Sequence, residues 1–391
     1  MASSQSFAHM RRRNIDVVVN CVRDNPGISR AEIAKEANLA KATISEIVDD
    51  LLTKKVLQEI GCKVSSGGRP AMGLTFNPSF GYVLGVCLDE TDVSACLLDL
   101  DGNVCSEVRS RVGFNWTAEQ VSRLLMDTLQ TELAERSCSR GSILALGVGL
   151  PGPVDLGSEG SAETICGEFG EVIQILRQHF DCPIVIDSNT NMSAIAEVKE
   201  SRTQDCDLVL VVRLGHMVRT ALVSGGKILS GSGGLAGELG HVSLPHSQSL
   251  CSCGMIGCIN TVAGIGAMLE RSQDAGIDVG GFDELVIRCR SGDNDARQIV
   301  MAAGEAVGYG LSTAINLIAP HVVIVCGPAT TAQEIILNPL RESTSKTCIA
   351  ENYAKCRIIA GQAGDKAECY GAGLLAIKQL AVVPGFLAVG A

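Results

Sequence analysis

One histidine and three cysteines occupy a short glycine-rich segment, and their spacing suits a metal ion. His241 is followed after nine residues by Cys251, Cys253 and Cys258, in the sequence Gly-Glu-Leu-Gly-His, a loop, and Cys-Ser-Cys-Gly-Met-Ile-Gly-Cys. Three thiolates and one imidazole complete the tetrahedral shell of Zn²⁺ and leave no open position for a substrate. The segment therefore predicts a structural zinc site, with chance clustering among 17 cysteines as the alternative. His246 is an alternative fourth ligand.

The first 76 residues have the pattern of a small helical DNA-binding domain. Apolar residues recur at helical spacing in three stretches, and the second stretch opens with the capping box Ser29-Arg30-Ala31-Glu32. A tight turn between the second and third helices is typical of a helix-turn-helix. Two strand-like segments around a Gly-Gly tip then resemble the wing of a winged helix. The predicted elements are helices near 14–23, from Ser29 to the turn at 37–39, and at 40–54, with strands at 56–59 and 74–76 around the tip at 65–70.

Several cations and small polar residues of this region are candidates for contacts with nucleic acid. The outward face of the third predicted helix would meet base edges and phosphates in a major groove. An arginine on the glycine-rich tip suits a minor groove, and three consecutive arginines predict a phosphate contact or a minor-groove arm. Asp49 and Asp50 count against DNA, and a solvated tail on a protein-binding module is the alternative. The expected DNA contacts are Arg11, Arg12, Arg13, Lys41, Thr43, Ser45 and Arg69.

Charge is distributed unevenly along the chain. Residues 1–75 carry 11 Lys and Arg against 8 Asp and Glu, whereas residues 76–391 carry 21 against 35. A basic first region on an acidic body predicts that only the first region meets a polyanion. No apolar run reaches membrane-spanning length, and the cysteine usage without a signal-peptide pattern favours a reducing cytoplasm. We therefore expect a cytoplasmic protein without a membrane partner.

From about residue 80 the sequence alternates strands with helices, which predicts an α/β body. The segments 82–88 and 93–99 are expected to pair, with Asp101-Gly102 as their turn. Further predicted elements are strands at 142–150, 183–187, 208–214, 220–223 and 321–326, and a helix at 192–200.

The motifs Gly-Glu-Leu-Gly-His and Cys-x-Cys-Gly-x-x-Gly-Cys, with nine residues between them, resemble the zinc signature of the ROK family (repressors, uncharacterised reading frames and sugar kinases). The Gly-Gly-Arg-Pro tip resembles the wing of ROK repressors. The resemblance covers nearly the whole chain and implies a two-lobed, actin-like and ribonuclease H-like body with a ligand cleft between the lobes. The implied domains are a winged helix-turn-helix at 1–76, a small lobe at 80–191 to which residues 372–391 return, and a large lobe at 192–371 with the zinc loop and a dimer interface.

The same resemblance indicates that the chemistry of a ROK sugar kinase is missing. The family's first phosphate turn, Asp-x-Gly-Gly-Thr, reads Cys-Leu-Asp-Glu-Thr at 87–91, so that carboxylates stand where a triphosphate would approach. The second turn, Gly-Thr-Gly-x-Gly, reads Gly-His-Met-Val-Arg at 215–219, and the late Gly-Gly reads Gly327-Pro328. Asn189 stands in place of the aspartate base, and loss of a general base costs about 10²- to 10⁴-fold in rate. The chain is therefore predicted not to be an enzyme.

Polar residues of the implied cleft remain suited to a sugar or sugar-phosphate effector. The resemblance places Glu238 and His241 where family members contact sugar hydroxyls, and an amide at 189 still donates and accepts hydrogen bonds. The alternatives are a vestigial pocket in a body that only dimerises, and a protein partner in place of the sugar. The predicted ligand contacts are Gly152, Asn189, Asn191, Glu238, His241 and Asn260.

Together these features predict a DNA-binding transcriptional regulator, a repressor of carbohydrate genes in which zinc braces the ligand-binding loop. It would bind a double-stranded DNA operator as a homodimer or tetramer, because paired heads add affinity on half-sites. One alternative is an ATP-dependent sugar kinase with an accessory DNA-binding head. The other is a zinc-stabilised interaction protein without a DNA role.

Overall fold

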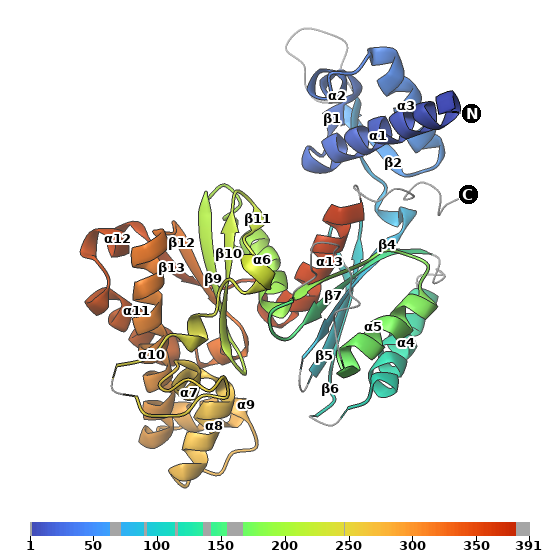
Figure 1. Ribbon diagram of the computed structural model, residues 1–391. Coiled ribbons are helices and arrows are strands. Elements are labelled where there is room, and N and C mark those ends of the chain that lie inside the picture. The colour runs from blue at the N-terminus through green and yellow to red at the C-terminus, as the bar shows by residue number, and fades with distance from the viewer. Residues whose placement is uncertain are drawn as a thin grey trace.

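The computed structural model describes residues 2–62, 72–89, 92–113, 116–135, 142–154, 167–245 and 247–380. The chain forms three parts (Figure 1): a head at residues 2–76 and two lobes, each built on a five-stranded sheet. The small lobe contains β4 to β8 and the last helix, and the large lobe contains β9 to β13. The head lies beyond the end of the small lobe at which the C-terminal helix finishes.

The head packs three helices against a three-stranded antiparallel sheet with strand order β1-β3-β2. Fully buried aliphatic side chains such as Ile33, Ile44 and Leu74 form its core. The capping box is confirmed, because the Ser29 hydroxyl accepts from the N–H of Glu32 (3.3 Å) and the Glu32 carboxylate accepts from the N–H of Ser29 (2.8 Å). The elements are α1 (Ala2–Asp24), β1 (Ile28–Ser29), α2 (Arg30–Glu36), α3 (Lys41–Thr53), β2 (Leu57–Cys62) and β3 (Met72–Phe76).

Helix α1 is longer than the apolar periodicity predicts. It begins at Ala2 and not near residue 14, because the residues in between include good helix formers and neither glycine nor proline. The three arginines at 11–13 therefore lie on a helix, and their contact with phosphates or a minor groove stays a prediction. The tip at 65–70, with Arg69, lies outside the described residues.

The small-lobe sheet has the order β6-β5-β4-β7-β8, with β4, β7 and β8 parallel and β5 and β6 antiparallel. The Asp101-Gly102 turn joins β5 to β6, so its predicted place between 82–88 and 93–99 is wrong. Strand β6 was not predicted, because its alternating burial gives only a weak apolar signal. Apolar side chains of two helices cover one face of the sheet. The elements are η1 (Pro78–Phe80), β4 (Tyr82–Leu88), β5 (Asp92–Asp99), β6 (Val104–Arg111), α4 (Ala118–Glu135), β7 (Ile143–Leu150), α5 (Gly167–His179) and β8 (Ile184–Ser188).

Helix α13 (Ala367–Leu380) covers the other face of this sheet at very close range. A Cβ atom on Gly147 of β7 would lie 1.9 Å from the carbonyl oxygen of Ala372, and one on Gly85 of β4 would lie 1.9 Å from that of Cys369. Because the obstructing atoms belong to the helix backbone, these positions accept only glycine. The helix therefore returns to the small lobe from Ala367 onward, and residues 381–391 lie outside the described part of the chain.

The large-lobe sheet has the order β11-β10-β9-β12-β13. Helix α6 (Asn189–Glu200) covers one face and packs against α13 between the two sheets (Figure 1). It begins at Asn189, before the predicted 192, because the Ser188 hydroxyl accepts from the N–H of Asn191 (3.2 Å). The strands are β9 (Leu208–Leu214), β10 (Val218–Ser224), β11 (Lys227–Ile228), β12 (Val322–Cys326) and β13 (Arg357–Ala360). The remaining helices are η4 (Ser232–Gly234), η5 (Leu239–His241), α7 (Asn260–Ala263), α8 (Ile265–Asp274), α9 (Phe282–Arg290), α10 (Asn294–Ile318), η6 (Pro328–Ala332), α11 (Glu334–Thr347), α12 (Ala350–Lys355) and η7 (Gly364–Lys366).

Within the described part of the chain, no helix combines the length and the apolar composition needed to cross a bilayer.

Candidate functional site

Four side chains of the large lobe converge into a cluster that can hold a metal ion. One donor atom from each of His241, Cys251, Cys253 and Cys258 lies within 4.8 Å of the others. The Sγ atoms of Cys253 and Cys258 are 3.7 Å apart, and Sγ of Cys251 is 3.8 Å from Nδ1 of His241. A tetrahedron with Zn–S bonds of about 2.3 Å has edges of about 3.8 Å. The donor set and its spacing therefore fit a tetrahedral zinc ion.

Local backbone structure folds the loop around this cluster. An antiparallel bridge joins Leu250 to Ile256. Gly254 and Gly257 have φ angles of 87° and 83°, a region that residues with a side chain rarely adopt. The glycine-flanked cysteine spacing is thus the signal that made this cluster predictable, and the alternative ligand His246 lies outside the described residues.

A carboxylate connects the cluster to the space between the lobes. Nε2 of His241 lies 3.5 Å from Oε2 of Glu238, and Oε1 of Glu238 accepts a hydrogen bond from Nη1 of Arg219. All three side chains are partly buried. A carboxylate behind a metal-binding histidine fixes the tautomer and the orientation of the ring. A continuous chain of polar contacts therefore leads from the His/Cys cluster through His241 and Glu238 to Arg219, at the space between the lobes.

A small, open polar pocket lies beside Arg219 between the lobes. The C-terminal ends of small-lobe strands, the first turn of α6 and the turn between β9 and β10 all contribute to its wall. Of the predicted ligand contacts, Gly152 and Asn189 line this pocket directly. The lining residues are Asp89, Pro151, Gly152, Asn189, Thr190, Arg213, His216, Met217 and Arg219.

The predicted asparagine contacts differ in how far the protein already satisfies them. The side chain of Asn189 donates to the carbonyl of Leu88 (2.9 Å) and accepts from the thiol of Cys87 (3.0 Å). Asn191 donates to Oδ1 of Asp187 (2.7 Å), which ties it to the end of β8. Both amides are therefore engaged in holding the start of α6.

Asn260 is only half satisfied. Its Oδ1 accepts from the N–H of Val218 (2.7 Å), whereas its buried Nδ2 has no hydrogen-bond partner in the described structure. Val218 lies between two pocket-lining residues, Met217 and Arg219. Because buried donors are nearly always satisfied in native proteins, this amide is suited to donate to a ligand or to water.

Arg213, which was not among the predicted site residues, contacts both lobes. Arg213 leaves β9 with only 9% of its side chain exposed. It donates from Nη2 to Asp89 (3.0 Å), at the end of β4, and from Nε to Glu368 (2.8 Å), in the first turn of α13. Burial alone would lower its pKa, but the two carboxylates outweigh burial and raise the pKa of Arg213. A lone charge within the apolar strand Leu-Val-Leu-Val-Val-Arg-Leu was the available sequence signal.

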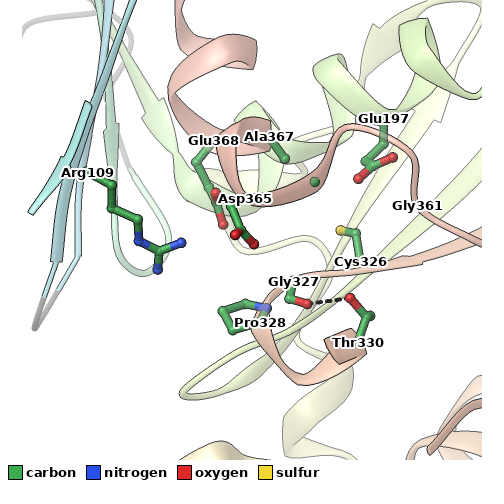
Figure 2. Close-up of a pocket in the computed structure, with 11 residues that line it drawn as sticks. Arg109, Glu197, Cys326, Gly327, Pro328, Thr330, Gly361, Asp365, Ala367 and Glu368 are labelled. Atoms are coloured by element: carbon green, nitrogen blue, oxygen red, sulfur yellow. Dashed lines mark hydrogen bonds between the residues drawn. The ribbon is translucent and has the colours of Figure 1, made fainter. Parts of the chain in front are cut away.

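A second pocket has an acidic wall (Figure 2). Arg109, from β6, lies opposite Asp365 and Glu368 in this pocket, and Gly327 and Pro328 form part of its floor. The buried Glu197 accepts hydrogen bonds from the N–H groups of Gln362 (2.7 Å) and Ala363 (3.2 Å). Asp365 and Glu368 face Arg109, whereas Glu197 is turned to backbone N–H groups. The carboxylates of this wall would repel the phosphates of a nucleotide.

The third helix of the head presents the predicted DNA contacts, and its acidic residues are neutralised. Lys41 is exposed, whereas Thr43 and Ser45 are partly buried. Arg11 of α1 pairs with Glu46 (2.7 Å) and reaches Asp50 (3.8 Å). Arg30 likewise pairs with Asp49 (2.6 Å). Arg13 is exposed, and the side chain of Arg12 lies outside the description. The carboxylates that count against DNA binding are therefore all paired.

Comparison with known proteins settles the family. Residues 83–379 match the sequence model of the ROK family. The chain belongs to the ROK family. This ROK protein is 25% identical over 392 residues to the xylose repressor of Caldicellulosiruptor bescii, and the alignment covers 96% of this chain and 98% of the repressor.

Two solved structures show how far the similarity of fold extends. A ROK family transcriptional regulator, described as a homolog of the E. coli MLC protein, has a TM-score of 0.76 and 21% identity and covers 98% of this chain. A ROK hexokinase from Thermus thermophilus has a TM-score of 0.61 and 24% identity, and covers 77% of this chain although all of the hexokinase is matched. The ROK body is thus shared with regulators and kinases, whereas the family match begins only after the head.

Proposed function

We propose that this ROK protein is a DNA-binding transcriptional repressor of carbohydrate genes that responds to a sugar or sugar-derived effector bound between its lobes. The observation that carries the proposal is the extent of similarity. The alignment with the xylose repressor covers 96% of this chain and includes the head. The hexokinase structure, although matched over its whole length, covers only 77% of this chain. A kinase needs no additional head, but a regulator needs one to reach an operator.

The head has the elements of a winged helix-turn-helix at residues 1–76. Helices α2 and α3 are joined by a short turn, and the β2–β3 hairpin follows them as a wing would. With α3 in a major groove, Lys41, Thr43 and Ser45 would face the DNA. Arg11, Arg12, Arg13 and Arg69 would then supply phosphate or minor-groove contacts.

Geometry of the cleft supports the absence of kinase activity. Asn189 occupies the place expected for the base, and its amide is hydrogen-bonded to Cys87 and Leu88. Phosphoryl transfer requires cations and backbone N–H groups around the phosphates, but Asp89 and Glu368 already bind Arg213 here. We expect no turnover in an ATP-dependent phosphorylation assay with a panel of hexoses and pentoses. Measurable turnover would instead support the kinase alternative.

The pocket beside Arg219 is where we place the effector. Asn260 Nδ2 is a buried donor without an acceptor in the described structure, and a sugar hydroxyl would accept its hydrogen bond. Gly152 and Asn189 line this pocket and would contact the ligand directly. Asn191, Glu238 and His241, which do not line it, would reach the same ligand only if the cleft rearranged on binding. Because Glu238 is held by Arg219 and His241, its carboxylate is presented in a fixed orientation. A sugar phosphate fits the same pocket, since Arg219 can offer further N–H donors.

A zinc ion would be held by His241, Cys251, Cys253 and Cys258 and would serve structure, because four protein ligands leave no site for a substrate. Its contribution when bound is to brace the loop that carries Glu238. We also propose a cytoplasmic homodimer or tetramer, since one small head on a half-site gives little affinity.

Selection of genomic DNA fragments by the purified, zinc-replete protein tests the proposal. A few recurrent palindromic sites upstream of genes are the expected result, with competitor DNA present to suppress non-specific retention. Weak retention without sequence preference would contradict the proposal and favour an interaction protein without a DNA role.

A further inference from the structure

One nearly buried cation holds elements of both lobes. Arg213 belongs to the large lobe, whereas its two carboxylate partners, Asp89 and Glu368, belong to the small lobe. Each partner is itself mostly buried, with 23% and 12% of the side chain exposed. Removing one partner of a buried ion pair leaves an uncompensated charge. We therefore treat the two ion pairs of Arg213 as one unit, the Arg213 triad. It is closed when both pairs are formed and broken when they are not.

The backbone around Arg213 is shaped to admit its side chain. A Cβ atom on Gly215 would lie 2.5 Å from Nη1 of Arg213, and one on Gly327 would lie 3.1 Å from its Cγ. Gly327 also has a φ angle of 94°, where a side chain would be strained. Glycines at the ends of β9 and β12 thus leave room for the guanidinium on two sides. The local backbone therefore accommodates the Arg213 side chain in this one position.

Helix α13 extends from this ion-pair triad toward the head. Glu368 lies in its first turn, whereas Ala376 and Leu380, in its last turns, share one apolar cluster with head residues such as Phe76. Along its length, close backbone contacts with Gly85 and Gly147 prevent the helix from sliding independently of the sheet. Figure 1 shows the helix ending on the side of the small lobe that faces the head. One rigidly packed helix therefore connects Glu368 to the base of the head.

We propose that Arg213 is a positioning residue that locks the two lobes together, and that breaking its triad is the step by which an occupied cleft alters the head. This inference rests on the proposed function. Asp89 and Arg213 both line the pocket assigned to the effector. A ligand there competes for their hydrogen bonds and shifts the population from closed to broken, because it contacts the two states differently.

Hydrogen exchange measured by mass spectrometry on the full-length, metal-replete protein without ligand tests the lock. Asp89→Asn removes one charge and keeps the shape of the side chain. We expect backbone exchange in segments 208–219 and 361–369 to rise about tenfold through local opening, while α4 exchanges as before. Arg213→Met should produce the same local change. Arg213→Lys retains a cation and should restore part of the protection, which a role in packing alone would not predict.

Asp92→Asn is the matched control. It removes the same charge close by in the sequence, but Asp92 pairs with Arg109 within the small lobe (3.5 Å). Its exchange in both segments should equal that of the wild type. If Asp89→Asn and Arg213→Met left the exchange of segments 208–219 and 361–369 unchanged, the proposal that Arg213 holds the lobes together would be wrong.

Affinity for an operator fragment from the genomic selection tests the coupling to the head. We expect Asp89→Asn to weaken binding about tenfold, within the usual range of coupling between sites, and Asp92→Asn to leave it unchanged. Raised exchange with unchanged operator affinity would overturn the coupling. If the wild-type protein selected no operator, the proposed function would fail, and the exchange data alone would decide whether the lock exists.

Discussion

Nε2 of His241 lies 3.5 Å from Oε2 of Glu238, and Nδ1 of the same ring faces the thiol of Cys251. The imidazole thus stands between the metal cluster and the polar wall of the cleft. A metal ion at Nδ1 leaves the ring proton on Nε2, where the carboxylate can accept it. Glu238 is then fixed by His241 on one oxygen and by Arg219 on the other. Metal occupancy should therefore affect the cleft as well as the loop.

Loss of the metal is expected to destabilise the protein. Cys258→Ser removes a fully buried thiol of the proposed zinc site, and structural zinc contributes directly to folding free energy. We expect Tm to fall by several degrees, at about 2–4 °C per kcal/mol for domains of 150–250 residues, together with loss of bound zinc. Elemental analysis and thermal unfolding measure both quantities. Cys105→Ser changes a thiol outside the cluster and should alter neither, whereas full zinc content in Cys258→Ser would exclude Cys258 as a ligand.

Close packing of α13 predicts a large effect from a very small substitution. In Gly147→Ala the new methyl group would lie 1.9 Å from the carbonyl oxygen of Ala372. Because helix backbone must move, we expect a loss of about 1–3 kcal/mol or more in the free energy of unfolding, measured by chemical denaturation. Gly61→Ala is the control, since its Cβ would have no neighbour within 4 Å. Equal stability of the two variants would show that helix and sheet separate easily.

The sequence predicted those features that depend on neighbouring residues. Capping at Ser29, the apolar faces of α2 and α3 and the cysteine spacing of the metal loop are all local patterns, and all appear in the structure. The Arg213 triad was missed because its partners lie 124 and 155 residues away along the chain. The hydrogen bond that engages Asn189 was missed for the same reason, since Cys87 is 102 residues away. Such contacts follow from the packing of the lobes and leave no local periodicity.

Glu197 predicts how stability depends on pH. Burial raises the pKa of this carboxyl, against the lowering effect of the N–H groups of Gln362 and Ala363. The folded state therefore retains this proton to a higher pH than the unfolded chain, whose value is 4.5. The stability contribution is complete below pH 4.5 and is lost as pH rises through the folded pKa.

Glu197→Gln tests this dependence because its amide does not ionise. We expect Tm of the variant, relative to wild type, to rise as pH increases above 4.5 and to become constant once pH exceeds the raised folded pKa of Glu197. Thermal unfolding at a series of pH values provides the measurement. Glu351→Gln is the control, because Glu351 is exposed and pairs with Lys355 in its own helix. A difference in Tm that stays constant with pH would contradict the raised pKa of Glu197.

The pairing of Arg11 with Glu46 predicts opposite effects of two substitutions on α3. Lys41→Ala removes an exposed cation from the face assigned to DNA, so operator affinity should fall and the salt dependence should lose a slope of about 1. Glu46→Ala instead removes an exposed carboxylate and releases Arg11 for a phosphate. Its affinity should rise about threefold to tenfold, with a steeper dependence on salt.

Fluorescence anisotropy of a labelled operator at several salt concentrations distinguishes these effects. Lys227→Ala, an exposed lysine of the large lobe, is the matched control and should leave both affinity and slope unchanged. Weaker binding of Glu46→Ala would mean that this carboxylate accepts a hydrogen bond from a cytosine amino group. In that case Glu46 would be a base-reading residue, and its ion pair with Arg11 would have to open when the head binds DNA.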